Sequence, residues 1–104
     1  MRAFLINAAD KTVTAVDVAD GLAGIRKLIG FDSIDSDEID ANGDRLFFDE
    51  KCFIRQLENS GRFRLDTLAP VAGRGVVIGS RDPGAELCDA AVSLEALKGR
   101  VVFS

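Results

Sequence analysis

The sequence contains no histidine, tyrosine or tryptophan. Without histidine, the protein lacks the commonest general base near neutral pH and the commonest metal ligand. Nucleophile pairs of the Ser-His or Cys-His type are therefore excluded. The missing tyrosine and tryptophan remove the usual aromatic anchors of protein interfaces and leave only phenylalanine for base stacking. These absences favour a binding or structural role over an enzyme, and we assign no catalytic residue, metal ligand or cofactor.

Cysteine and long apolar runs are also scarce. The two cysteines, Cys52 and Cys88, form no CxxC pair, so we expect small core thiols; a disulfide would require the fold to bring them together. No apolar run approaches the roughly 20 residues of a membrane-spanning helix. The apolar run at residues 3–6 is too short for a signal peptide. We therefore predict a cytoplasmic protein that has no membrane partner.

The composition fits an ordinary folded domain. The chain has 104 residues, of which 47% are hydrophobic and 29% charged; this is typical of one soluble globular unit. We predict a single α+β domain over residues 1–104. It consists of a largely antiparallel β-sheet of about six strands, one main helix and a short C-terminal helix.

Periodicity and end signals place the elements of the first third. Alternating and β-branched residues predict strands at Arg2–Asn7 and Thr12–Val18. Apolar residues at helical spacing predict a helix over Gly21–Ile29, with Asp20 as its N-cap and Gly30 as its stop.

The second half of the chain gives mixed signals. Lys51–Leu65 fits either a short helix or two strands, Cys52–Arg55 and Arg62–Leu65, and the turn signal at residues 59–61 favours the strands. The remaining predicted elements are a loop at Leu68–Gly75, a buried strand at Val76–Ile78, a turn at Arg81–Gly84, a helix at Leu94–Lys98 capped by Ser93 and stopped by Gly99, and a last strand at Arg100–Ser104.

The stretch from Asp32 to Glu50 holds eight acids and one base, whereas the rest of the chain holds nine acids and twelve bases. Its Asn42-Gly43 pair predicts a β-hairpin with Asp40 opposite Arg45 and Ile39 opposite Leu46. This register defines a core face of Ile39, Ala41, Leu46 and Phe48, and a mostly polar face of Glu38, Asp40, Arg45 and Phe47.

A calcium-binding EF-hand is disfavoured in this stretch. With Gly43 as the loop glycine, the first ligand would be Glu38 and the last Asp49, which are the wrong types for those positions. No predicted helix flanks the loop.

The density of carboxylates exceeds what a solvated edge requires, but edge strands also carry charge simply to prevent aggregation, and that simpler interpretation is favoured over a partner surface. Among functional hypotheses, we choose a non-enzymatic cytoplasmic binding protein that uses this hairpin against a basic protein partner. The predicted partner-binding residues are Asp35, Asp37, Glu38, Asp40 and Asp44. Two alternatives use other chemistry. The same acids would serve a divalent-cation-binding protein or a carboxylate-based enzyme, or the chain is a structural or dimeric accessory protein.

A loose basic set comprises Arg55, Arg62, Arg64, Arg74 and Arg81. The overall acidity disfavours direct nucleic-acid binding, which depends on many unopposed cations. A solvated strand face is favoured, and the same arginines could bind the acidic hairpin of a second copy in a homodimer. The Gly73–Gly79 stretch resembles a phosphate loop only superficially and favours a tight turn before a buried strand.

Several short motifs occur in a recognisable order. They are residues 2–7, 12–14 and 16–17, Lys27-Leu28-Ile29-Gly30, Asn42-Gly43-Asp44, Phe48-Asp49-Glu50, Pro70 to Gly75 with Val77 and Gly79, Ser93-Leu94-Glu95, and Val101 to Phe103. Their order resembles an uncharacterised family of small proteins from phages, prophages and mobile elements. The resemblance implies such an origin and assigns no residue roles. For a phage protein, the basic partner could be a host nucleic-acid-binding protein, with the hairpin standing in for phosphates.

Overall fold

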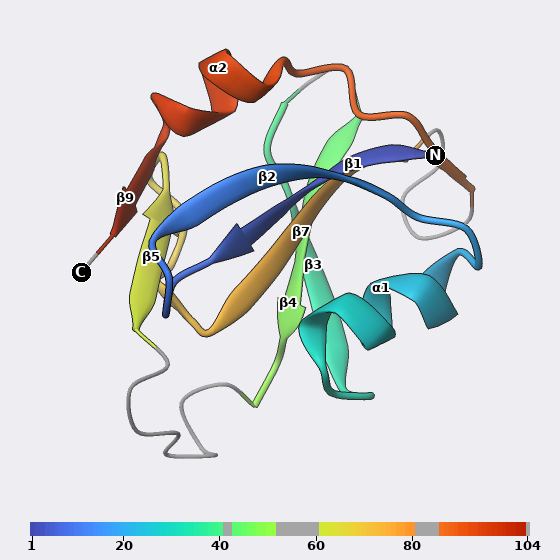
Figure 1. Ribbon diagram of the computed structural model, residues 1–104, viewed down its shortest axis with the longest axis horizontal. Coiled ribbons are helices and arrows are strands. Elements are labelled where there is room, and N and C mark those ends of the chain that lie inside the picture. Colours follow the sequence, from blue (N-terminus) through green and yellow to red (C-terminus); the bar gives the residue numbers. More distant parts are fainter. Residues whose placement is uncertain (41–42, 52–60, 81–85, 104) are drawn as a thin grey trace.

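The computed structural model describes residues 1–40, 43–51, 61–80 and 86–103 (Figure 1). The elements are β1 (Arg2–Asn7), β2 (Thr12–Asp17), α1 (Leu22–Ile29), β3 (Ile34–Glu38), β4 (Asp44–Asp49), β5 (Arg62–Leu65), β6 (Val71–Ala72), β7 (Arg74–Ser80), β8 (Leu87–Cys88), α2 (Leu94–Lys98) and β9 (Val101–Phe103). The larger sheet has the order β2-β1-β7-β4-β3, with β8 also paired to β7, and the smaller one has the order β6-β5-β9. All the pairings are antiparallel. The predicted α+β fold class is confirmed.

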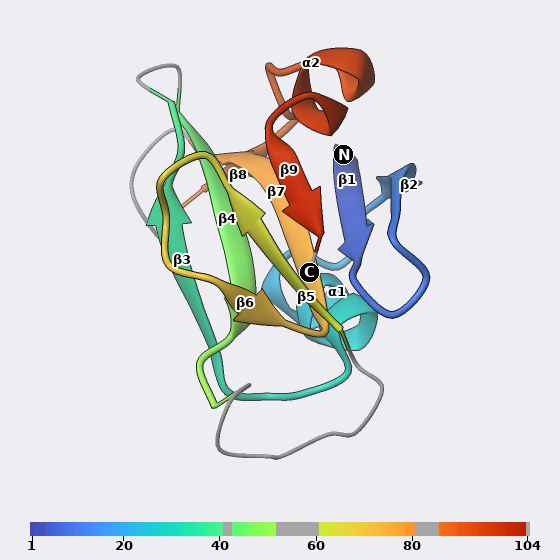
Figure 2. The same ribbon diagram turned by 90° about the vertical axis from the view of Figure 1, so that its left-hand side faces the viewer.

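The larger sheet is covered on both faces. Helix α1 packs on one face, and the smaller sheet and α2 lie over the other (Figures 1 and 2). The central strand β7 shows this in its side chains: Val76 and Ile78 belong to the apolar cluster under α1, and Val77 belongs to the cluster under the smaller sheet. All three are fully buried. A strand buried on both faces needs a continuous apolar run, which is what the sequence has there.

The two sheets approach closely at Gly75. A Cβ built on this residue would lie 2.7 Å from the Cζ of Phe63 and 2.9 Å from the Cδ1 of Leu46. Phe63, on β5 of the smaller sheet, is fully buried. Only glycine leaves room for this ring, so the glycine sets the spacing of the two sheets.

The first third of the chain follows the prediction closely. Strands β1 and β2 pair from Arg2 opposite Asp17 to Asn7 opposite Thr12. Helix α1 ends at Gly30, which has the left-handed conformation expected of a stop (φ 92°). The predicted N-cap is wrong: Gly21 holds that position with φ 59°, and no side chain caps the helix. The helix therefore begins at Leu22, which is one residue too late for Asp20 to be its N-cap.

The second half contains more strand than predicted. Strand β5 confirms Arg62–Leu65, and α2 begins as predicted, since the Ser93 hydroxyl accepts a hydrogen bond from the Ala96 N–H at 3.2 Å. The predicted loop at Leu68–Gly75 is wrong in part, because it contains β6 and the start of β7. Strand β7 continues through its glycines because ladder hydrogen bonds need only backbone groups. The predicted Cys52–Arg55 strand and Arg81–Gly84 turn lie outside the described residues.

The hairpin of β3 and β4 is confirmed, but its register differs from the prediction by two residues. Glu38, rather than Asp40, lies opposite Arg45, and Asp37, rather than Ile39, lies opposite Leu46. The cause is the third strand. The carbonyl of Gly43 accepts a hydrogen bond from the Ser80 N–H at 2.8 Å, which sets where β4 begins.

A shift of two residues keeps each side chain on its predicted face. Leu46 is accordingly buried under the smaller sheet. The prediction for Phe47 is wrong, because its side chain does not lie on a mostly polar face but is buried in the cluster under α1. Strand β4 lies between β3 and β7, where α1 packs on the face that carries Phe47 and the smaller sheet packs on the face that carries Leu46.

Candidate binding site on strand β3

Strand β3 lies at one edge of the larger sheet (Figure 2). Among the described residues it pairs with β4 alone. Asp35 and Glu38 are exposed there, and Asp37 is half-buried. Asp35 and Asp37 point to one side of the sheet and Glu38 to the other, because side chains alternate along a strand. Three of the five predicted partner-binding residues therefore stay together at this edge.

Asp44 is used inside the fold. Its side chain is fully buried, and its two carboxylate oxygens accept hydrogen bonds from the backbone N–H groups of Ala91 and Val92, each at 2.9 Å. These bonds tie the start of β4 to the segment that precedes α2. A carboxylate in this position stabilises the fold and lies out of reach of a partner at the surface.

Asp40 is engaged by a cation from the far end of the chain. The guanidinium of Arg100 donates to both carboxylate oxygens of Asp40, at 2.9 and 3.2 Å, and to the carbonyl of Ile39 at 3.3 Å. The same guanidinium also donates to both carboxylate oxygens of Asp66. The Arg100 clamp, as we call this set of Arg100, Asp40 and Asp66, joins the end of β3 to the smaller sheet.

The Arg100 clamp shifts the ionisation of its members. Hydrogen bonding to Arg100 lowers the pKa of Asp66 below its usual range; desolvation opposes this shift, and the charge of Arg100 adds to it. Hydrogen bonds to Asp66 and then to Asp40 raise the pKa of Arg100. The carboxylate of Asp40 is therefore held by a cation of its own chain, which it shares with Asp66.

Arg45, the only base in the acidic stretch, also serves the edge strand. Its Nε donates to the Ser36 hydroxyl at 3.0 Å and its Nη2 to the Ser36 carbonyl at 3.2 Å. The Ser36 N–H donates to the carboxylate of Asp35 at 2.8 Å. Sequence reasoning missed these contacts, because they depend on a register that a third strand sets.

The predicted basic set does not come together in one place within the described residues. Arg62 and Arg64 are exposed on the smaller sheet, opposite Ala72 and Val102 respectively. Arg74 begins β7, and its guanidinium donates to the carbonyl of Leu28 at 3.3 Å. Arg55 and Arg81 lie outside the described residues. Within the Gly73–Gly79 stretch, Gly73 is a bend between β6 and β7, and residues 74–79 belong to β7 itself. The stretch is therefore a strand rather than a phosphate loop, and the predicted tight turn is limited to Gly73.

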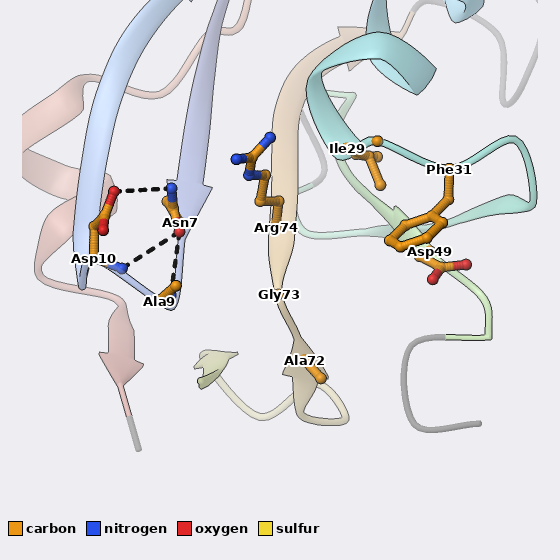
Figure 3. Close-up of a pocket in the computed structure, with 10 residues that line it drawn as sticks. Asn7, Ala9, Asp10, Ile29, Phe31, Asp49, Ala72, Gly73 and Arg74 are labelled. Atoms are coloured by element: carbon orange, nitrogen blue, oxygen red, sulfur yellow. Dashed lines mark hydrogen bonds between the residues drawn. The ribbon is translucent and has the colours of Figure 1, made fainter. Parts of the chain in front are cut away.

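A pocket of about 400 Å³ lies between the β1–β2 turn, the end of α1 and the start of β7 (Figure 3). The side chain of Asn7 accepts from the N–H groups of Ala9 and Asp10 and donates to the Asp10 carboxylate at 3.2 Å. On the opposite wall, the buried carboxylate of Asp49 accepts from the Lys51 N–H at 3.1 Å. These bonds hold the walls of the pocket. No motif marked it, because its lining comes from four separate segments.

The described part of the chain gives little support for a metal site, a disulfide or a membrane-spanning helix. No group of three or more Cys, Asp or Glu side chains there is arranged to hold a metal ion. Cys88, in β8, is a half-buried free thiol, and Cys52 lies outside the described residues. Neither α1 nor α2 has the length and apolar character needed to cross a membrane.

Comparison of the chain with models of protein families, with curated proteins and with solved structures returns no match.

Proposed function

We propose that this protein is a small non-enzymatic binding protein that presents the acidic edge strand β3 to a basic partner. The observation that supports the proposal is the separation of the acids into two groups. Asp40 and Asp44 are engaged within the fold, whereas Asp35, Asp37 and Glu38 remain at the rim of the sheet. The rim is where a partner can approach without disturbing the core.

The spacing of the carboxylates suits an extended partner segment that carries a basic residue at every second position. Asp35 and Asp37 project from the same side of β3, about 7 Å apart. Each exposed ion pair with a lysine or arginine would contribute about 0.2–1 kcal/mol. Binding through these groups is therefore weak for each contact, additive over several contacts, and sensitive to salt.

A peptide with alternating lysines tests the proposal. The probe is a capped peptide of sequence Lys-Thr-Lys-Thr-Lys, titrated calorimetrically at low ionic strength. The triple variant Asp35→Asn, Asp37→Asn and Glu38→Gln should bind it about tenfold more weakly than the wild type, since the lost pairs at Asp35 and Asp37 and the lost attraction of the nearby Glu38 amount to about 1.4 kcal/mol.

The matched control removes the same charge elsewhere. Asp20→Asn, Glu86→Gln and Glu95→Gln neutralise three exposed acids outside β3. This control should bind the peptide like the wild type. Equal losses in the two triple variants would show that net charge alone attracts the peptide, and the proposal would then be wrong.

The divalent-cation and carboxylate-enzyme alternative lacks a comparable observation, because the acids of the stretch diverge among the edge, the core and the Arg100 clamp. Titration with Ca²⁺, Mg²⁺ and Mn²⁺ separates the two functions. Tight cation binding that is lost in Asp40→Asn would favour the alternative over the acidic edge.

A further inference from the structure

The backbone of β3 directs alternate residues away from the sheet. The Ile39 N–H donates to the Asp44 carbonyl, and the Glu50 N–H donates to the Ser33 carbonyl. In an antiparallel pair, every second residue of a strand exchanges these bonds with its partner. Odd-numbered residues of β3 therefore face β4, and the even-numbered residues Ile34, Ser36 and Glu38 direct their N–H and carbonyl groups outward.

At Ser36, the central outward residue, side chains already bond the backbone N–H and carbonyl groups. Its N–H is bonded by the Asp35 carboxylate at 2.8 Å, and its carbonyl is bonded by the Arg45 guanidinium at 3.2 Å. These two contacts satisfy the groups that an added strand would use first. Charged side chains on an edge strand are a known way to keep other strands from pairing with it.

We propose that the edge of β3 is a guarded site for strand addition, which accepts an extended partner segment with basic residues at alternate positions. The proposal rests on the proposed function and names the way in which the partner binds. The added segment pairs with the backbone of Ser36, and its basic side chains take the carboxylate of Asp35 from the Ser36 N–H. Arg45, released from the Ser36 carbonyl, lies directly opposite Glu38 and can pair with it.

The preference for basic residues at alternate positions of the added segment follows from the geometry of the outer side of β3. Asp35 and Asp37 direct their backbone groups toward β4, so an added strand would face them in non-hydrogen-bonded pairs. Opposed Cα atoms in such pairs are only about 4.5 Å apart, which brings the side chains close together. A lysine or arginine opposite each carboxylate is favoured, and an acid or a large apolar residue there is disfavoured.

The same rule disfavours a second copy of this chain as the added strand. The antiparallel self-pairings that align most of β3 through its outward groups are centred on Asp35, Ser36 or Asp37. In each of these registers, a carboxylate of Asp35 or Asp37 lies directly opposite a carboxylate of the other copy. Like charges in opposed positions destabilise a sheet.

A proline at residue 36 separates strand addition from simple charge attraction. Ser36→Pro removes the outward N–H and leaves the ladder with β4 and all three carboxylates in place; proline is tolerated at such edge positions. We expect it to weaken binding of the Lys-Thr-Lys-Thr-Lys peptide at least tenfold. The matched control is Ala15→Pro on β2, the opposite edge strand, which should bind the peptide like the wild type. Ala15 also directs its N–H outward, because the Val18–Met1 bond places even-numbered residues of β2 toward β1.

A modified peptide gives a second measurement that does not depend on the folding of the proline variant. Methylation of the backbone nitrogens that would face Ser36 removes hydrogen-bond donors and keeps the charges, and it should weaken binding to the wild type to the same extent.

The outcomes distinguish this proposal from the proposed function. If the proline variant and the methylated peptide bind normally while the β3 charge variant does not, strand addition is wrong and the acidic surface stands. If the charge variant also binds normally, the proposed function fails. A wild-type dimer in sedimentation that Ser36→Pro dissociates would overturn the proposal in favour of self-pairing.

Discussion

The carboxylate of Asp44 accepts a hydrogen bond from the backbone N–H of Val92, 48 residues further along the chain, at a distance of 2.9 Å. A second bond, from Ala91, completes the pair. The hairpin is thereby attached to the segment that leads into α2, and within the described residues no strand pairing joins the two.

Replacement of Asp44 should therefore destabilise the protein. In Asp44→Asn, one oxygen becomes an NH₂ group that faces a backbone N–H donor in a buried site. We expect the free energy of unfolding to fall by about 1–3 kcal/mol, the cost of an unsatisfied buried donor. Urea denaturation measures the loss, and Asp20→Asn, at an exposed position, should change stability by less than about 0.5 kcal/mol.

Loss of the Arg100 clamp should weaken the contact between β3 and the smaller sheet. Arg100→Met keeps most of the apolar side-chain volume but leaves Asp40 and Asp66 without their shared cation. Because all three side chains are partly exposed, we expect a loss of only about 1–2 kcal/mol. Urea denaturation of Arg64→Met, which removes an exposed arginine from the smaller sheet, provides the comparison. Similar losses in the two variants would mean that the clamp contributes little.

The Arg100 clamp also predicts a dependence of stability on acid. The folded pKa of Asp66 is below its unfolded value of about 3.8, so its contribution to stability is full above the unfolded pKa. It is lost as the pH falls through the lower, folded pKa. The wild type should therefore lose more stability than Arg100→Met between pH 5 and pH 2. An NMR titration of the Asp66 carboxylate that gave an ordinary pKa in the wild type would contradict this assignment.

The approach of the two sheets predicts a strict size limit at residue 75. In Gly75→Ala, the added methyl group would clash with the rings and methyl groups of Phe63 and Leu46. We expect a loss of about 1–3 kcal/mol from overpacking, measured by thermal or urea unfolding. Gly99→Ala is the control, because a Cβ there meets its nearest atom at an ordinary 3.6 Å. That variant should be neutral or slightly stabilised.

The acidic stretch from Asp32 to Glu50 shows which structural features can be predicted from residues that are close together in the sequence. The Asn42-Gly43 pair and the flanking alternation were sufficient to predict a hairpin, and β3 and β4 confirm it. They did not settle the register, because the bond from Ser80 to Gly43 that sets it comes from a strand 37 residues away. Once the register changed, the predicted Asp40–Arg45 pair was replaced by Asp40–Arg100 and by the contact of Arg45 with Ser36.

What the sequence determined by itself was local: the stop of α1 at Gly30, the Ser93 cap of α2, the strands with clear alternation, and the absence of histidine chemistry. These features depend on interactions among residues close together in the chain. The tertiary structure decided which acids stay at the surface. Asp44 and Asp40 are hydrogen-bonded by groups 48 and 60 residues away, whereas Asp35, Asp37 and Glu38 lie on a strand that has a neighbour on one side only within the described residues. Charge alone does not distinguish these two groups, because what separates them is the set of distant donors that the fold brings within hydrogen-bond reach.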